Sequence, residues 1–103
     1  MTDLQSGETL IMVNKIVLDL QGFTSEWDLH QYMQKRFDIC EYYGHNPDAL
    51  WDAVYLWFDQ PTVIEVRNLD KLPANMKSVA EVLRKVFQRL DQEDPFLQVV
   101  FKS

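Results

Sequence analysis

Short β-branched segments alternate along this chain with longer segments of helical periodicity, and this alternation limits the folds that are open to it. Residues 15–20, 62–67 and 96–101 have the composition of strands, whereas residues 24–37, 46–56 and 78–93 show helical spacing of apolar side chains. Successive strands are therefore separated by at least one helix, and such crossovers favour parallel pairing. We predict a small two-layer α/β domain in which helices cover one face of a three-stranded parallel sheet.

Local signals place the starts of two of these helices. Asn46 is a preferred N-cap residue and Pro47 suits the first helical position, so this helix should begin there and run to about Leu56. Ser78 is followed three residues later by Glu81, which is the pattern of a capping box. We therefore expect the third helix to begin at Ser78, after a loop that holds at most a short helical turn.

The chain length and the cysteine content exclude several classes of protein. A chain of 103 residues fits one domain, which we place at residues 15–103 after a flexible lead-in of residues 1–14. The single cysteine, Cys40, excludes an internal disulfide and a cysteine-rich zinc site. No apolar run reaches the roughly 20 residues that span a bilayer. Residues 1–10 lack the pattern of a signal peptide, so we expect a cytoplasmic protein without a membrane segment.

Charge is distributed unevenly along the chain. The 10 basic and 16 acidic residues give a net charge of -6, which disfavours direct binding to nucleic acid. Residues 37–66 contain no lysine or arginine, and the acidic residues within them account for the whole excess: Asp38, Glu41, Asp48, Asp52, Asp59 and Glu65. Such a segment favours a cationic partner, although a solvated surface stretch has the same composition.

The second predicted helix has two different faces. At about 100° per residue, one stripe carries the polar residues Asp48, Asp52, Tyr55 and Asp59. The opposite side is apolar and is expected to face the core through Leu50, Ala53, Val54 and Trp57. Trp51 lies beside the polar stripe, so its ring should be partly exposed. Like charges four residues apart disfavour an isolated helix by about 0.2–0.5 kcal/mol per pair. The stripe is either a recognition surface or an ordinary solvated helix face.

Residues 41–52 read EYYGHNPDALWD, and this motif closely resembles the barstar family, the intracellular inhibitors of the bacterial ribonuclease barnase. The resemblance extends back through residues 28–31 and forward through Trp57, Pro61 and residues 63–65. Residues 25–66 align almost without a gap, whereas the third helix and the last strand fit more loosely. The family's fold, a three-stranded parallel sheet covered by helices, is the fold predicted above.

The resemblance implies a function and a set of contact residues. The second helix and the loop before it would block the active site of a secreted-type bacterial ribonuclease, in a one-to-one complex with a monomeric inhibitor. Carboxylates would replace RNA phosphates, with Asp52 entering the phosphate pocket. The matching contact positions are Tyr42, Gly44, Asn46, Asp48, Ala49, Trp51, Asp52 and Trp57. To these we add His45 in the same loop, Tyr55 and Asp59 on the polar stripe, and Glu93 on the third helix.

Three positions depart from the family pattern. Leu56 stands where the family has glycine, Tyr55 replaces a smaller residue, and Arg89 lies near a position where the family carries an acid. Glycine just past a helix adopts a left-handed backbone without a steric penalty. Leu56 therefore either lengthens the helix or places a bulky group in the contact. Glu93, one turn after Arg89, could supply the missing acid.

An enzyme is not indicated. The two histidines, His30 and His45, have no nucleophile or acid partner that the sequence can place, and there is no glycine-rich phosphate motif. His45 and Asp48 lack an evident third metal ligand, so neither a metal nor another cofactor is predicted. Two functions remain. The first is inhibition of a guanyl-specific, barnase-type ribonuclease, and the second is binding of a different basic partner, such as another toxin or a regulator, by a barstar-like module.

Overall fold

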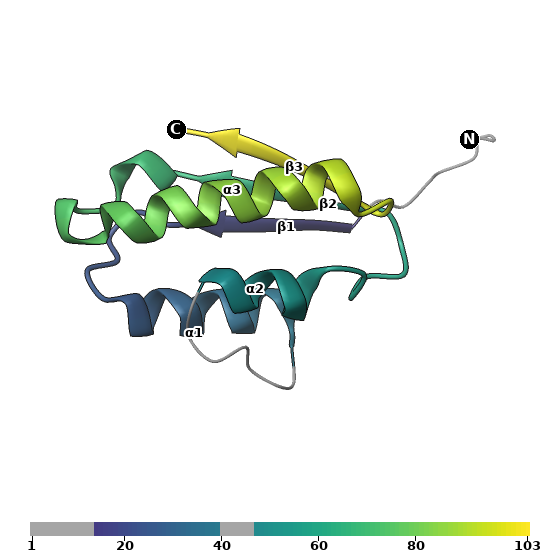
Figure 1. The fold of residues 1–103 in the computed structure, drawn as a ribbon, viewed down its shortest axis with the longest axis horizontal. Coiled ribbons are helices and arrows are strands. Elements are labelled where there is room, and N and C mark those ends of the chain that lie inside the picture. Colours follow the sequence, from purple (N-terminus) through teal and green to yellow (C-terminus); the bar gives the residue numbers. More distant parts are fainter. Residues whose placement is uncertain (1–13, 40–46) are drawn as a thin grey trace, which may run out of the picture.

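The computed structural model describes residues 14–39 and 47–103, with the side chains of Pro47 and Asp48 excepted. Its elements are β1 (Asn14–Asp19), α1 (Glu26–Phe37), α2 (Pro47–Val54), β2 (Thr62–Arg67), η1 (Leu69–Lys71), η2 (Ala74–Met76), α3 (Lys77–Glu93) and β3 (Leu97–Lys102), where η marks a short 3-10 helix (Figure 1). This is the order of strands and helices predicted from the sequence. No helix within these two ranges is long and apolar enough to cross a membrane.

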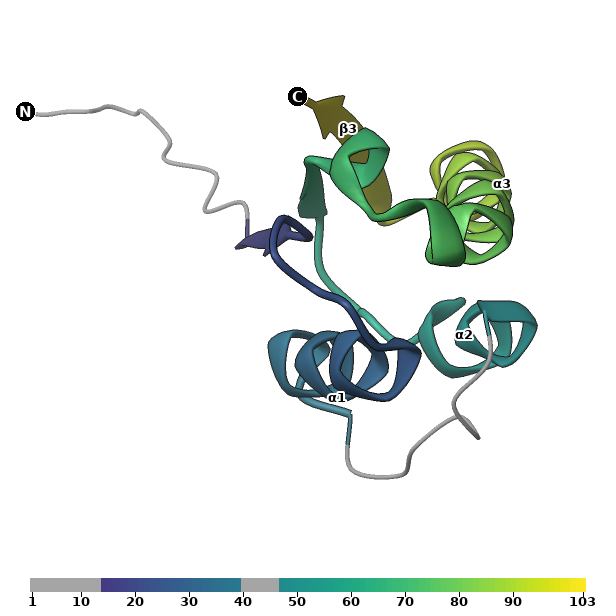
Figure 2. The ribbon, with the colours of Figure 1, turned by 90° about the vertical axis from the view of Figure 1, so that its left-hand side faces the viewer.

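The three strands form one parallel sheet in the order β1-β2-β3, with β2 in the centre. Ile16, Ile64 and Val99 lie opposite one another in the register of this sheet. Figure 2 shows that α1, α2 and α3 all lie on one side of the strands. The prediction of a two-layer α/β domain with a parallel sheet is therefore confirmed.

The hydrophobic core lies between the sheet and the three helices. Its fully buried side chains come from every layer, and they include Leu18, Leu29, Met33, Leu50, Val54, Ile64, Leu83, Phe87 and Leu90. His30 is also fully buried, on the helix face that carries Leu29 and Met33. Because a general base must reach a substrate, this burial agrees with a structural role for His30 and not with a catalytic one.

Two helix boundaries differ from the prediction. The capping box at Ser78 is wrong, because α3 begins at Lys77 and its start has no side-chain cap. The preceding turn η2 leads directly into α3, and the N–H of Lys77 already bonds the carbonyl of Ala74. The second boundary is the end of α2, which lies at Val54 because Leu56 adopts a left-handed backbone with a φ of 61°.

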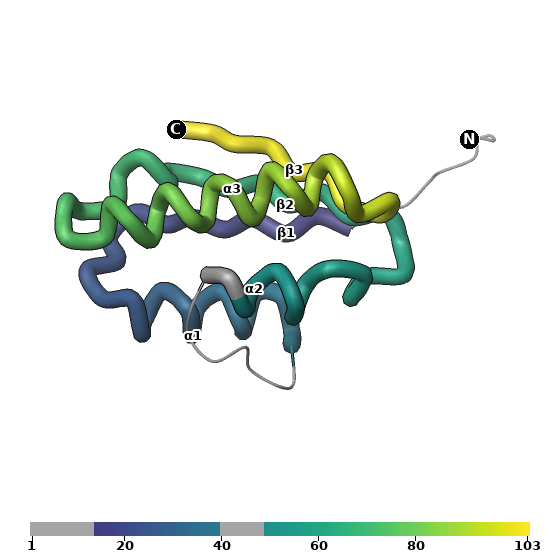
Figure 3. Tube along the Cα trace, in the orientation of Figure 1, coloured from purple at the N-terminus to yellow at the C-terminus, as the bar shows by residue number. Residues whose placement is uncertain are grey.

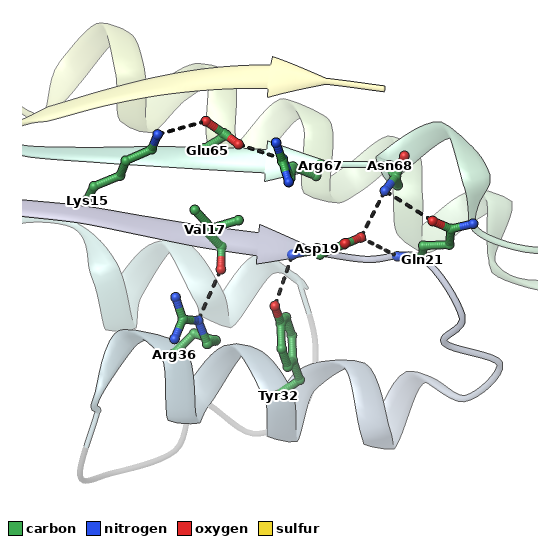
Figure 4. A network of polar contacts seen from close by, with 9 residues as sticks. All are labelled: Lys15, Val17, Asp19, Gln21, Tyr32, Arg36, Glu65, Arg67 and Asn68. Atoms are coloured by element: carbon green, nitrogen blue, oxygen red, sulfur yellow. Dashed lines mark hydrogen bonds and ion pairs between the residues drawn. The ribbon is translucent and has the colours of Figure 1, made fainter.

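No described helix covers the second face of the sheet, which carries a network of ion pairs (Figure 4). The carboxylate of Glu65 in β2 lies 3.2 Å from Nζ of Lys15 and 2.6 Å from Nε of Arg67. The hydrogen bond from Lys15, together with the charges of Lys15 and Arg67, lowers the pKa of Glu65 despite the opposing effect of burial. The negative charge of Glu65 is therefore compensated within the sheet, and Glu65 does not contribute to an exposed acidic surface.

The outer edge of β1 is occupied by two side chains from α1 (Figure 4). The backbone N–H of Asp19 donates to the hydroxyl of Tyr32 at 2.9 Å, and Nε of Arg36 donates to the carbonyl of Val17 at 3.0 Å. These bonds occupy backbone groups that an edge strand would otherwise offer to another strand. Thus α1 contributes to the core and also protects an edge of the sheet.

The carboxyl ends of the strands are tied together by Asn68, which follows β2 with a left-handed backbone (φ 62°). Its side-chain amide donates to Oδ1 of Asp19 at 2.9 Å, and its backbone N–H donates to the carbonyl of Lys102 at 2.8 Å. The hydrogen bonds from Asn68 and from the N–H of Gln21 lower the pKa of Asp19. This end of the sheet is therefore held by polar contacts that join the last residues of β1 and β3 to the residue after β2.

Candidate functional site

The second helix presents Asp52 to solvent because its opposite side is held in the core. Leu50 and Val54 are fully buried, and Ala49 and Ala53 are partly buried against the same core. Asp52 lies on the other side of α2 and is exposed, as the helical periodicity predicts. Since α2 also packs on α3, this carboxylate stands on a rigid scaffold.

An aromatic cluster continues this face of α2 toward α3. The rings of Trp51 and Tyr55 stack with centroids 4.4 Å apart and planes inclined by 16°. The guanidinium of Arg89 on α3 lies 4.1 Å from the centroid of the Trp51 ring, and its Nε lies 3.3 Å from the carboxylate of Glu93. Trp51 is half-buried, as predicted. The charge of Glu93 is thus partly compensated by a cation on its own helix.

A buried carboxylate at the end of α3 holds the turn that follows α2. The N–H of Leu56 donates to Oδ2 of Asp94 at 2.8 Å, and the N–H of Phe96 donates to Oδ1 of the same residue at 2.9 Å. Asp94 is only 3% exposed. Such charge-assisted hydrogen bonds are stronger than neutral ones. They bring the end of α2 and the start of β3 together at one end of the molecule (Figure 3).

Leu56 does not lengthen the helix. The N–H of Trp57 turns back to the carbonyl of Val54 at 3.0 Å, and the left-handed backbone of Leu56 stops α2. For a residue with a Cβ atom, this backbone conformation costs about 1–2 kcal/mol. The side chain of Leu56 is 55% exposed, so its bulk is placed at the surface and not in the core.

Two predictions from the helical periodicity are wrong. Trp57, assigned by that periodicity to the core, is 48% exposed, and Asp59 lies in a bend beyond the helix and not on its polar stripe. Both errors have the same cause, because the periodicity is extended past Val54, where the left-handed turn at Leu56 redirects the chain. The resemblance to the barstar family, which places Trp57 at the surface, is correct on this point.

The region as a whole is an exposed surface of carboxylates and aromatic rings. In the ranges that the structure describes, no group of three or more histidine, cysteine, aspartate or glutamate side chains could hold a metal ion. Asp52, Asp59 and Glu93 are exposed. Carboxylates accept bonds from arginine and lysine, and aromatic rings supply contact area. Such a surface is suited to binding a basic protein.

Comparison with known proteins assigns the chain to a family. Residues 13–102 match the family described as Barstar (barnase inhibitor). The chain belongs to the barstar family. It is also 31% identical over 81 residues to a Bacillus subtilis (strain 168) protein named "Putative ribonuclease inhibitor YrdF", and the alignment covers 79% of this chain and 89% of that relative. The resemblance predicted from residues 41–52 is thereby confirmed.

Some of the contact residues expected for a barstar-family protein lie outside the described part of the chain. These are Tyr42, Gly44, His45 and Asn46, together with the side chain of Asp48, whose backbone lies in the first turn of α2. The others lie within it, on α2 or close to its end: Ala49, Trp51, Asp52, Tyr55, Trp57 and Asp59. Glu93 joins them through Arg89, which contacts Trp51. The role of every one of these residues in binding stays a prediction.

The structure brings Asp94 and Phe96 next to the turn after α2, and the sequence does not place them there. An aspartate before a proline indicates a helix exit, but no local pattern pairs it with a backbone N–H 38 residues earlier. Phe96 is predicted as the first residue of the last strand. It instead precedes β3 and is 39% exposed.

Proposed function

We propose that this protein inhibits a ribonuclease of the barnase type by covering the enzyme's active site with α2 and the segment before it. The observation that carries the proposal is the exposed carboxylate of Asp52 on a helix whose opposite side, through Leu50 and Val54, is fully buried. A ribonuclease holds RNA phosphates with cationic groups, and a carboxylate on a rigid scaffold can bind there with little loss of conformational entropy. Membership of the barstar family and the name of the Bacillus subtilis relative support this function.

In this proposal the carboxylates act at the centre of the contact and the aromatic rings around it. Asp52 enters the phosphate pocket, and Asp48 lies beside it. The remaining contacts come from Tyr42, Gly44, His45, Asn46, Ala49, Trp51, Tyr55, Trp57, Asp59 and Glu93. The inhibitor acts as a monomer, in the cytoplasm, in a one-to-one complex with the enzyme.

The experiment measures hydrolysis of RNA by a barnase-type ribonuclease at increasing inhibitor concentration. Asp52→Ala should weaken inhibition about 10- to 100-fold, because a hydrogen bond to a charged group contributes about 1.5–3 kcal/mol. Glu81→Ala is the matched control, since Glu81 is an exposed acid about three helical turns before Glu93 on α3. Small and equal effects of the two substitutions, in variants with unchanged circular dichroism, would contradict the proposal.

A second candidate function is binding of a different basic partner by the same face. Arg89 favours it, because its guanidinium lies 4.1 Å from the centre of the Trp51 ring and so places a cation within a face meant for a cationic active site. If the folded protein leaves barnase-type ribonuclease fully active yet binds another basic toxin saturably and one to one, this second function is favoured.

A further inference from the structure

We propose that Leu56, Trp57 and Phe96 form an apolar patch that selects the ribonuclease partner, an inference that rests on the proposed function. The patch fits a partner that has an apolar depression beside the cations of its active site. The three side chains are 55%, 48% and 39% exposed, respectively. The proposal adds Leu56 and Phe96 to the binding face. It also gives a function to Leu56, the residue that stands where the family has glycine.

The presence of leucine, and not glycine, at position 56 is not explained by the stability of the free protein. Its φ of 61° lies in the region that favours glycine, and its side chain is mostly exposed, so it gains little from burial. A glycine would adopt the same turn without the steric penalty. A leucine in this place therefore requires a reason outside the free protein, and contact with a partner supplies one.

Asp94 holds the two new members of the patch next to each other. One of its carboxylate oxygens accepts the N–H of Leu56 and the other accepts the N–H of Phe96, at 2.8 and 2.9 Å. The carboxylate is buried, and its own backbone N–H bonds the carbonyl of Leu90 at 3.0 Å, which ties it to α3. The patch is thus preorganised, and a preorganised apolar group loses little entropy when it binds.

The patch is continuous with the proposed inhibitory face. Leu56 and Trp57 directly follow Tyr55, whose ring stacks on Trp51, and Asp94 directly follows Glu93. Of the four most exposed large apolar side chains in the described part of the protein, three lie here, and Trp27 at the start of α1 is the fourth. Grouped apolar side chains at a surface are typical of interaction sites.

Charge decides which partner covers the patch. Asp52 and Asp59 are exposed within four residues of Leu56 in the sequence, and the exposed Glu93 directly precedes Asp94, so the partner must be cationic next to its apolar depression. A second copy of this chain would bring the same carboxylates against one another. That repulsion disfavours self-association through this face and favours a basic enzyme.

The test compares Leu56→Gly and Phe96→Ser with the wild type, using a barnase-type ribonuclease as the probe. Each substitution should weaken inhibition about tenfold, the usual loss for a buried apolar anchor. The Tm of Leu56→Gly should be unchanged or higher, because glycine adopts the left-handed turn freely. Trp27→Ser is the matched control, since it removes an exposed aromatic ring in the first turn of α1, outside this patch, and it should inhibit as the wild type does.

The outcomes separate this inference from the proposed function. If Asp52→Ala loses inhibition while Leu56→Gly and Phe96→Ser inhibit as strongly as the wild type, or more strongly, the apolar patch is wrong and the proposed function stands. If the wild-type protein itself does not inhibit the enzyme, the proposed function fails and this inference fails with it. If Trp27→Ser loses as much inhibition as Leu56→Gly and Phe96→Ser do, the inference is also overturned, because the effect would not be specific to this patch.

Discussion

The buried carboxylate of Asp94 accepts the backbone N–H of Leu56 at 2.8 Å and thereby joins the end of α3 to the turn after α2. This bond sets where α2 stops and how Trp57 is presented to solvent. The left-handed backbone of Leu56 is energetically unfavourable by itself, so a strong, charge-assisted hydrogen bond stabilises it. The hydrogen bond from Leu56 to Asp94 therefore links the backbone of this turn to the way in which the proposed binding face presents Leu56 and Trp57.

Asp94→Ala should lower the free energy of unfolding by about 2–4 kcal/mol, because the backbone N–H groups of Leu56 and Phe96 would lose a buried, charged acceptor. Urea denaturation monitored by tryptophan fluorescence measures the effect. Asp70→Ala is the control, since Asp70 is exposed and its carboxylate accepts, within the described part of the chain, only a 3.4 Å hydrogen bond from the hydroxyl of Ser103. The control should change stability by no more than about 0.5 kcal/mol. A loss below about 1 kcal/mol for Asp94→Ala would show that this bond does not hold the turn.

Tyr32→Phe should destabilise the protein by about 1 kcal/mol and increase its self-association at high concentration. The substitution keeps the ring but removes the hydroxyl that accepts the N–H of Asp19, which frees part of the outer edge of β1. Sedimentation velocity and urea denaturation measure the two effects. Tyr55→Phe is the control, since Tyr55 is half-buried and its hydroxyl forms no hydrogen bond with the described residues, and it should leave self-association unchanged. Equal behaviour of both variants would contradict the role of α1 in protecting this edge.

Glu65 should contribute to stability at neutral pH and lose that contribution in acid. Its pKa lies below the ordinary value of 4.5, chiefly because Lys15 donates a hydrogen bond to its carboxylate. A lowered pKa in the folded state means that the stabilisation is present above the unfolded-state pKa and disappears as the pH falls through the folded-state pKa. The free energy of unfolding of Glu65→Gln should therefore fall below that of the wild type near pH 7, and the difference should close in acid.

Urea titrations from about pH 3 to pH 7 measure this dependence. Glu81→Gln is the matched control, because Glu81 is exposed and forms no ion pair with the described residues. Its stability should follow the wild-type curve at a constant offset. A constant offset for Glu65→Gln as well would mean that the ion pairs with Lys15 and Arg67 do not stabilise the fold.

Much of the fold follows from patterns that are local in the sequence. The strand predicted at residues 62–67 coincides with β2, and Leu50 and Val54 are buried as their periodicity predicts. These predictions succeed because burial on one face imposes a regular spacing on the apolar side chains. The exposure of Asp52 follows from the same regularity.

The parts that were not predictable depend on contacts between distant segments. No neighbouring residue in the sequence explains why α2 ends before Leu56, because its partner Asp94 directly follows a different helix, α3. The capping box at Ser78 fails for a related reason, since η2 packs ahead of α3 and begins the helical conformation earlier. Glu65 belongs to the acidic segment in the sequence, yet the pairing of β1 with β2 sets it against Lys15.

Arg89→Ala should speed the association of the protein with a barnase-type ribonuclease about two- to fivefold at low salt. The substitution removes a cation from the proposed face and frees the carboxylate of Glu93, which Arg89 now holds at 3.3 Å. It should also lower stability by about 0.5–1 kcal/mol through the loss of the cation–π contact with Trp51. Stopped-flow measurements of Trp fluorescence at several salt concentrations give the association rate constant.

Arg84→Ala is the matched control for this experiment, because Arg84 is also an arginine on α3 that contacts an aromatic ring, with its guanidinium 5.2 Å from the centroid of Phe101. It changes the net charge equally but lies away from α2, so any gain in rate should be smaller. If Arg89→Ala instead slows association, and most strongly at low salt, Arg89 contacts an acidic group of its partner. The proposed ribonuclease site binds RNA phosphates through cations, so that result would favour the second candidate function over inhibition of a barnase-type enzyme.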